Sequence, residues 1–337
     1  HPDVRRMLLT QKSFTEAARA LALWVGMLID EAHRHPDADK REAADDLIQM
    51  LTPIIKAYFT DMGSECANLA VQTYGGHGFI RENGVEQLVR DARITQLYEG
   101  TNGIQALDLV GRKLPMKGGR AAQRLLGLMS AFIAENKTNE KMKEFVEPLE
   151  KALGRVQDAA FFLMQNAMKN PDEAGAAATD LLRLMALTAM TYMWNRIAIA
   201  AHKGIEAGND NAFYEAKLNT ARFYIAKVLP QTTSLNHQIK AGAATLMALP
   251  AEAAGLAQVP GRTQIVRING DTIASWNDVR EAVIDPGVDR LRFDFSHHKA
   301  MSPDEVEAVE DIVYARILGN DAVMIREMSM DDARAAG

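Results

Sequence analysis

The chain has 337 residues, of which 47% are hydrophobic and 24% charged, and its formal net charge is −6. This length can bury a sizeable core and suggests two or more domains, while the acidic balance argues against nucleic acid as the main partner. The single cysteine, Cys66, excludes a disulfide within the chain and fits a reducing compartment. No apolar run is long enough to span a membrane. We therefore expect a cytoplasmic protein with no membrane span and no nucleic-acid partner.

Aromatic residues make up only 6% of the chain and there are 17 methionines, which favours helices packed on helices. Apolar residues recur at helical spacing from Pro2 to about Ala32, and Pro2 suits the first turn of a helix. A second helical pattern follows and runs to Ala70, with Pro53 expected to kink it. His33 and His35 are too far apart around a helix to bind a metal together, so no metal site is predicted.

A glycine-rich turn follows the second helix, in the run Tyr74-Gly75-Gly76-His77-Gly78-Phe79. Glycine has no Cβ, so it adopts positive φ and lets a ligand approach the backbone. Free N–H groups at such a turn can hold a pyrophosphate. The alternative is a helix C-cap and a tight turn without a ligand.

A lone carboxylate, Glu99, follows the apolar run Ile94 to Tyr98 and precedes Gly100, just after the helix that Asn83-Gly84 opens. We expect a glutamate there to lie in a dry pocket, where desolvation raises its pKa toward that of a general base. The alternative is an ordinary surface residue in a loop.

The combined pattern resembles the acyl-CoA dehydrogenase family. Its order and spacing match from Gln72 through Arg112, in the motifs Gln72-x-x-Gly75-Gly76-x-Gly78-Phe79, Arg90-Asp91-Ala92-Arg93-Ile94 and Tyr98-Glu99-Gly100-Thr101-Asn102. In that family the glutamate of this last motif takes the α-proton of an acyl-CoA thioester while the β-hydrogen leaves as hydride to N5 of FAD. The resemblance implies that Glu99 is this base.

The same resemblance assigns the remaining site residues. It places Gln72, Gly75 and Gly76 on the FAD of a neighbouring subunit, Thr101 and Asn102 on the flavin of their own subunit, and Tyr98 and Gly100 at the substrate. It also implies an electron-accepting flavoprotein as partner and a homodimer or dimer of dimers. Family members have an N-terminal helical domain and a middle β-domain, and no β-rich segment precedes His1. We therefore expect weak or no FAD binding and no turnover from this chain by itself.

Three domains are predicted, in a mainly α fold. Residues 1–115 resemble the C-terminal helical bundle of the family, and residues 120–256 resemble the additional helical domain of its larger members, including the long-chain and 3-methylmercaptopropionyl-CoA types. In this second bundle, helices are expected from Met142 to Met168, from Asn170-Pro171 onward, and from Ala212 to Met247 with a break at Pro230. Residues 257–337 are expected to form a small α+β tail.

The tail has a composite appearance, because its two parts resemble unrelated proteins. Gln264 to Ile268 reads as a strand and Asn269-Gly270 as a hairpin turn, within a stretch (264–284) that resembles part of a PDZ domain. Residues 289–337 resemble a fragment of alanyl-tRNA synthetase. Two functions are open: the catalytic helical half of a flavin-dependent acyl-CoA dehydrogenase, or a catalytically silent helical assembly module. A tRNA-linked accessory role rests on the tail alone.

Overall fold

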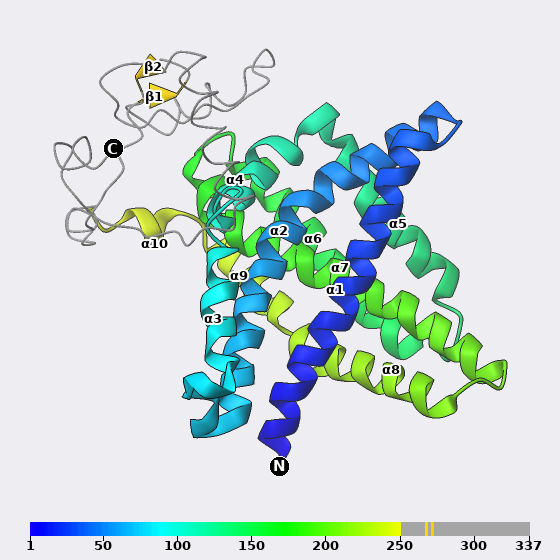
Figure 1. Ribbon diagram of the computed structural model, residues 1–337. Helices are drawn as coiled ribbons and strands as arrows, with labels where there is room; N and C mark the ends of the chain where they lie inside the picture. Colours follow the sequence, from blue (N-terminus) through cyan, green and yellow to red (C-terminus); the bar gives the residue numbers. More distant parts are fainter. Residues whose placement is uncertain (251–266, 269–270, 273–337) are drawn as a thin grey trace, which may run out of the picture. The chain divides into compact units, whose positions relative to one another are not determined.

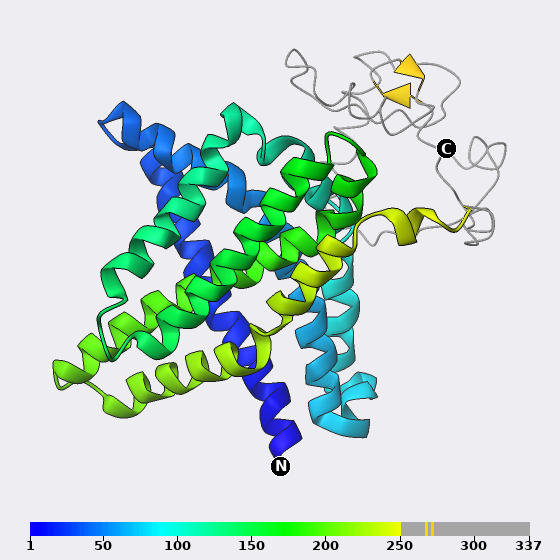
Figure 2. The ribbon, with the colours of Figure 1, turned by 180° about the vertical axis from the view of Figure 1, so that it is seen from behind.

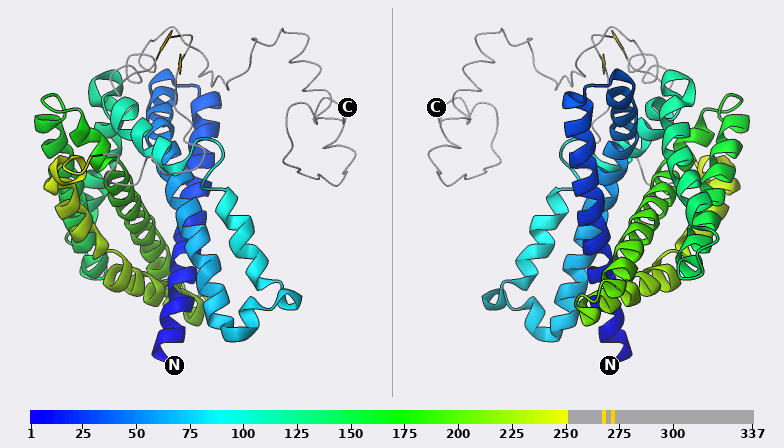
Figure 3. Two further views of the ribbon diagram at one scale, coloured as in Figure 1. Left: turned by 90° about the vertical axis from the view of Figure 1, so that its left-hand side faces the viewer. Right: turned by 90° about the vertical axis from the view of Figure 1, so that its right-hand side faces the viewer.

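The computed structural model describes residues 1–250, 267–268 and 271–272. By their contacts, His1–Arg262 form one compact unit and Thr263–Gly337 a second. The described part of the first unit is built from helices, seen from four sides in Figures 1, 2 and 3. The predicted mainly α fold is confirmed, and among the described residues no helix is both long and apolar enough to cross a membrane.

The α-helices are α1 (Pro2–Arg34), α2 (Ala38–Tyr74), α3 (Val85–Ile94), α4 (Asn102–Asp108), α5 (Arg120–Asn136), α6 (Lys143–Asn166), α7 (Asp172–Glu206), α8 (Asn211–Phe223), α9 (Gln231–Ala241) and α10 (Ala244–Met247). Short 3₁₀ turns are η1 (Gly75–Phe79), η2 (Arg81–Asn83) and η4 (Met116–Gly119). Two π-turns are η3 (Leu109–Lys113) and η5 (Tyr224–Val228).

Helices α1 and α2 form a long pair at the N-terminal end of the chain (Figure 1). Pro2 occupies the first turn of α1, as predicted, and the side chain of Asp37 caps α2 by accepting a hydrogen bond from the backbone of Asp39. Helix α2 continues through Pro53, whose side chain is buried, to Tyr74. The second predicted helix is therefore confirmed and extends one turn further than its apolar pattern indicated.

Helix α7 lies at the centre of the unit and packs against α1, α2, α4, α6, α8 and α9 (Figures 1 and 2). Because it has neighbours on every side, its middle is buried all round from Leu184 to Asn195, and Leu187, Met190 and Trp194 are fully buried. The edge-on contact between Trp24 of α1 and Tyr192 joins it to the N-terminal pair. The two predicted helical bundles thus share one hydrophobic core. A domain division at residues 115–120 stays a prediction.

Each of these π-turns ends two residues before a proline. The N–H of Leu114 donates to the carbonyl of Leu109 at 2.9 Å just before Pro115, and the N–H of Leu229 donates to Tyr224 at 3.0 Å just before Pro230. Proline has no N–H and its ring crowds the preceding turn, so a wider turn accommodates it. The predicted break at Pro230 is confirmed.

A buried carboxylate ties the start of α2 to the segment that leads into α5. The Asp46 side chain is fully buried, and it accepts from Arg120 Nε at 2.8 Å and from Lys117 Nζ at 3.1 Å. The guanidinium of Arg124 lies 3.4 Å away. Burial by itself raises the pKa of Asp46, but the hydrogen bonds from Arg120 and Lys117 outweigh it and hold the pKa below its ordinary value. We call this cluster the Asp46 clamp.

In the second unit the structure describes the strands β1 (Arg267–Ile268) and β2 (Asp271–Thr272). They pair antiparallel, with Arg267 opposite Thr272 and Ile268 opposite Asp271. This register confirms the predicted hairpin pairing at these four positions. The remaining predicted features of the tail lie outside the described residues.

Candidate functional site

The glycine turn ends α2. Gly75 has φ of 61°, which is the left-handed region, and its N–H donates to the carbonyl of Gln72. Gly78 is needed for packing, because a Cβ there would lie 2.3 Å from the carbonyl oxygen of Val71. Gly76 has neither constraint, and open space surrounds the Cβ position of both Gly75 and Gly76. The turn therefore presents bare, exposed backbone at these two positions, beside the exposed side chain of Gln72.

Helix α3 carries the chain back from this turn to the middle of α2. Gly84, with φ of 70°, precedes the helix, and α3 then packs along α2 (Figure 3). Val85 is the buried residue of α3, and the loop after the helix lies beside Lys56. At 1.5 Å per residue, Lys56 and Gly75 are about 28 Å apart along α2. The structure thus brings Tyr98 to Asn102 together in one loop beside the middle of α2. The glycine turn lies apart from this loop, at the C-terminal end of α2.

The loop holds Glu99 in an unusual backbone conformation. Glu99 has φ of 57° and Gly100 has φ of 78°, so two successive residues are left-handed. Side chains hold both carbonyls: Gln105 Nε2 donates to Glu99 at 2.8 Å, and Lys56 Nζ donates to Gly100 at 2.6 Å. The Thr101 hydroxyl accepts from the N–H of Ile104 and caps α4.

The side chain of Asn102 anchors this loop to α2. Its Nδ2 donates to Asp61 Oδ1 at 2.5 Å, to Thr60 Oγ1 at 2.9 Å and to the carbonyl of Ala57 at 3.1 Å. Its Oδ1 accepts from Lys56 Nζ at 2.9 Å. The predicted contact of Asn102 with flavin stays a prediction, and in this chain its side-chain amide is bonded to α2.

Sequence reasoning missed Lys56, Thr60 and Asp61. Lys56 and Thr60 stand one turn apart on α2 and Asp61 follows Thr60 directly, which is the only signal that their spacing offers. Gln96 Nε2 also donates to Asp61, at 2.6 Å, and the Asn102 N–H donates to the carbonyl of Gln96 at 3.2 Å.

Glu99 itself is exposed, contrary to the expected dry pocket. The flanking Leu97 and Tyr98 are also exposed, so this chain supplies no wall around the carboxylate. Among the described residues, none forms a hydrogen bond or ion pair with the Glu99 carboxylate, and none accepts from the backbone N–H groups of Glu99 and Gly100. The loop therefore presents an unpaired carboxylate and unpaired donors side by side.

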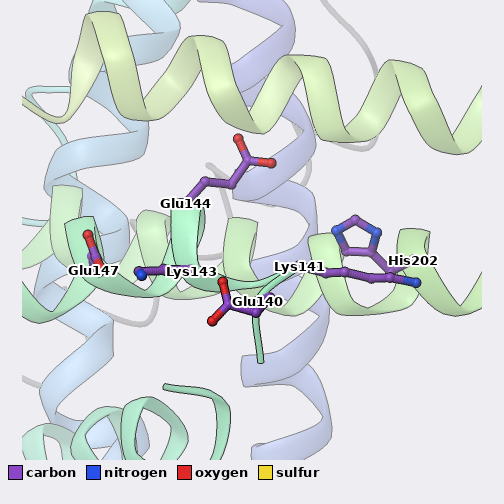
Figure 4. A pocket seen from close by; sticks show the side chains of 6 residues that line it. All are labelled: Glu140, Lys141, Lys143, Glu144, Glu147 and His202. Atoms are coloured by element: carbon purple, nitrogen blue, oxygen red, sulfur yellow. The ribbon is translucent and has the colours of Figure 1, made fainter. Parts of the chain in front are cut away.

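Two cavities lie elsewhere in the described part of the chain. One of about 570 Å³ is lined by Glu140, Lys141, Lys143, Glu144, Glu147 and His202, with His202 contributed by α7 (Figure 4). The other, of about 490 Å³, lies where α1, α2 and α3 meet and includes Cys66. Burial, with a further contribution from Glu65, raises the pKa of the Cys66 thiol to about 11, so the thiol is a poor nucleophile at neutral pH. Neither cavity contains Glu99 or the glycine turn.

Comparison with known proteins assigns the helical part of the chain. Residues 1–114 match the family described as acyl-CoA dehydrogenase, C-terminal domain, and residues 125–250 match the family described as acetyl-CoA dehydrogenase C-terminal like. The chain is 36% identical over 240 residues to 3-methylmercaptopropionyl-CoA dehydrogenase of Ruegeria pomeroyi, covering 71% of this chain and 41% of that protein. Residues 1–114 and 125–250 therefore belong to the acyl-CoA dehydrogenase family, as the resemblance predicted.

A solved acyl-CoA dehydrogenase from Bacillus anthracis, complexed with FAD, superposes with a TM-score of 0.57 at 15% identity, covering 94% of this chain and 49% of that one. This likeness supports the helical fold. The chain spans about two fifths of the length of the curated dehydrogenases that it matches.

The tail matches a different protein. Over 49 residues, which are 14% of this chain and 6% of the relative, the chain is 59% identical to alanine–tRNA ligase of Acetivibrio thermocellus. The predicted likeness to alanyl-tRNA synthetase is confirmed over that length. The PDZ resemblance of residues 264–284 stays a prediction.

Proposed function

We propose that the chain supplies the catalytic helical part of a flavin-dependent acyl-CoA dehydrogenase, which oxidises the α,β carbon–carbon bond of an acyl-CoA thioester. The observation that carries this proposal is the loop around Glu99. There a carboxylate with no partner among residues 1–250 adjoins backbone N–H groups that also have none, on a firmly anchored turn. The family membership and the name of the Ruegeria pomeroyi relative supply the substrate class.

The residues present fit FAD as the cofactor. The open space at Gly75 and Gly76 lets a diphosphate approach the backbone, with Gln72 beside it. Following the family resemblance, we assign these three to the FAD of a neighbouring subunit, and Thr101 and Asn102 to the flavin of the same subunit. The two groups are about 28 Å apart along α2, which is compatible with two separate cofactors. When bound, FAD accepts the β-hydrogen of the substrate as hydride.

In this proposal Glu99 is the general base that takes the α-proton. Its carboxylate has no competing partner in the described part of the chain, so it is free to meet the substrate. Tyr98 and Gly100 flank the acyl and thioester groups, and the N–H of Glu99 donates to the thioester oxygen, where negative charge develops. Because a water-exposed carboxylate is too weak a base for this proton, bound substrate and adjoining protein must cover Glu99 during catalysis.

Oligomerisation would provide such cover. Apolar side chains are exposed along the glycine turn and α3: Tyr74, Phe79, Ile80, Leu88 and Ile94. We propose that they pack in a homodimer or dimer of dimers, and that an electron-accepting flavoprotein reoxidises the cofactor. Exposed apolar side chains that cluster in this way are typical of a protein–protein interface.

The proposal is tested by flavin content and by dye reduction driven by acyl-CoA thioesters from short to long, both measured with the full chain joined to the N-terminal and middle domains that family members carry. We expect Glu99→Gln to lower the rate at least about a hundredfold, the usual contribution of a general base, with unchanged flavin content. Glu147→Gln, at an exposed glutamate of α6, is the matched control and should leave the rate unchanged. Activity that survives Glu99→Gln would remove Glu99 as the base.

The second candidate is a catalytically silent helical assembly module. The exposure of Glu99, together with the apolar face around α3, favours it. Colourless protein that forms oligomers without flavin would support this candidate, whereas yellow protein with bound FAD supports the dehydrogenase.

A further inference from the structure

Lys56, in the middle of α2, reaches the loop that carries Glu99. Its ammonium donates to the Gly100 carbonyl at 2.6 Å and to Asn102 Oδ1 at 2.9 Å. Partial burial lowers the pKa of Lys56, while the carboxylates of Glu99 and Asp61 act in the opposite direction. The cation thus lies between helix and loop, in the field of the Glu99 carboxylate but bonded to the backbone beside it.

The conformation that Lys56 contacts needs external support. A residue with a Cβ is unfavourable at positive φ, so Glu99 at 57° persists only where its surroundings fix it. Within one peptide plane the C=O and the next N–H point in opposite directions. The Gln105 bond to the Glu99 carbonyl therefore sets the direction of the Gly100 N–H, and the Lys56 bond to Gly100 sets that of the Thr101 N–H.

Lys56 and Asn102 act as one support. Asn102 accepts from Lys56 and donates to Asp61 and Thr60, so the loop is attached to successive turns of α2. Asp61 also accepts from Gln96, at the start of the loop. Both ends of the segment that carries Glu99 are therefore anchored on the same helix.

We infer that Lys56 is a positioning residue. With Asn102 and Asp61 it fixes the Gly100–Thr101 peptide at the C-terminal end of the left-handed Glu99–Gly100 turn, and so supports the conformation that presents the carboxylate. Lys56 acts through the loop and does not touch the substrate. The catalytic meaning of this role rests on the proposed function, whereas the ordering of the loop is a property of the chain alone.

Hydrogen exchange of the full chain measures the ordering directly. In Lys56→Met the hydrogen-bonded amides within residues 96–105, including the Asn102 N–H bonded to Gln96, should exchange about tenfold faster, while α7 keeps its rates. Lys56→Arg should restore slow exchange because the guanidinium can donate to the same two acceptors. Lys40→Met, at an exposed lysine in the first turn of α2, is the matched control and should change nothing in the loop. Unchanged exchange in Lys56→Met overturns the inference.

Kinetics separate this inference from the proposed function. Lys56→Met should lower kcat for acyl-CoA oxidation about tenfold with a smaller change in KM, and Lys56→Arg should recover most of the loss. Faster loop exchange with unchanged kcat would overturn the positioning role. Activity that survives Glu99→Gln overturns the proposed function, and the exchange measurement, which needs neither flavin nor turnover, still decides whether Lys56 orders the loop.

Discussion

The central helix α7 and the segment 75–101 are held in place by different forces. Leu187, Met190 and Trp194 of α7 are fully buried, so hydrophobic packing fixes that helix. In α3 only Val85 is buried, and Phe79 of the preceding turn is 82% exposed. Side-chain hydrogen bonds to α2 fix the segment instead. The part of the chain with the candidate chemistry therefore contributes little to the core and depends on polar anchoring.

Trp194→Ala should have the largest effect, because it empties the middle of the core. We expect a loss of about 3–5 kcal/mol in the free energy of unfolding, measured by the helical circular dichroism signal in urea. A loss near that of a surface substitution would contradict the central place of α7.

Asp46→Asn should have an intermediate effect, because it removes the charge that Lys117 and Arg120 share in the Asp46 clamp. We expect a loss of about 2–3 kcal/mol at neutral pH, since the cations are partly exposed and can rehydrate. The pKa of Asp46 is lower in the folded chain than its ordinary 3.8, so this contribution is present above about pH 4 and lost as the pH falls through the folded value. Urea unfolding of both proteins from pH 7 to pH 3 should show their stabilities converge, and a difference that grows with acid would contradict the clamp.

Leu88→Ala should have the smallest effect on stability. Leu88 of α3 is 53% exposed, so we expect a change within about 0.5 kcal/mol in the same urea measurement. Loss of oligomer in sedimentation at unchanged stability would sharpen the contrast with Trp194. A cost as large as that of Trp194→Ala would show that α3 belongs to the core after all.

Apolar periodicity predicted most of the helical fold. It placed α1, α2 and α7, because long helices with a buried face carry their pattern locally in sequence. The break at Pro230 was also predictable from local sequence, because proline has no N–H and removes a hydrogen bond to the preceding helical turn. The end of α9 at Gly242, with φ of 73°, was missed, because apolar residues continue on both sides of it.

The site was predicted only in part. The Tyr98–Asn102 motif named the loop, but its support by Lys56 and Asp61 joins residues more than forty positions apart, which no local pattern encodes. The exposure of Glu99 was also missed, because burial depends on what packs over a loop and the loop's own apolar residues face outward. The π-turn before Pro115 was not predicted either. Amino-acid composition does not show whether a helix widens by one residue per turn before a proline.

Helix α2 spans 37 residues, or about 55 Å at 1.5 Å per residue. Asp46 lies near the N-terminal end of the helix, Lys56 lies at its middle, and Gly75 follows its C-terminal end. One continuous helix therefore carries the Asp46 clamp, the support of the Glu99 loop and the glycine turn. The spacing between the two parts of the candidate site is set by the length of α2 that separates them.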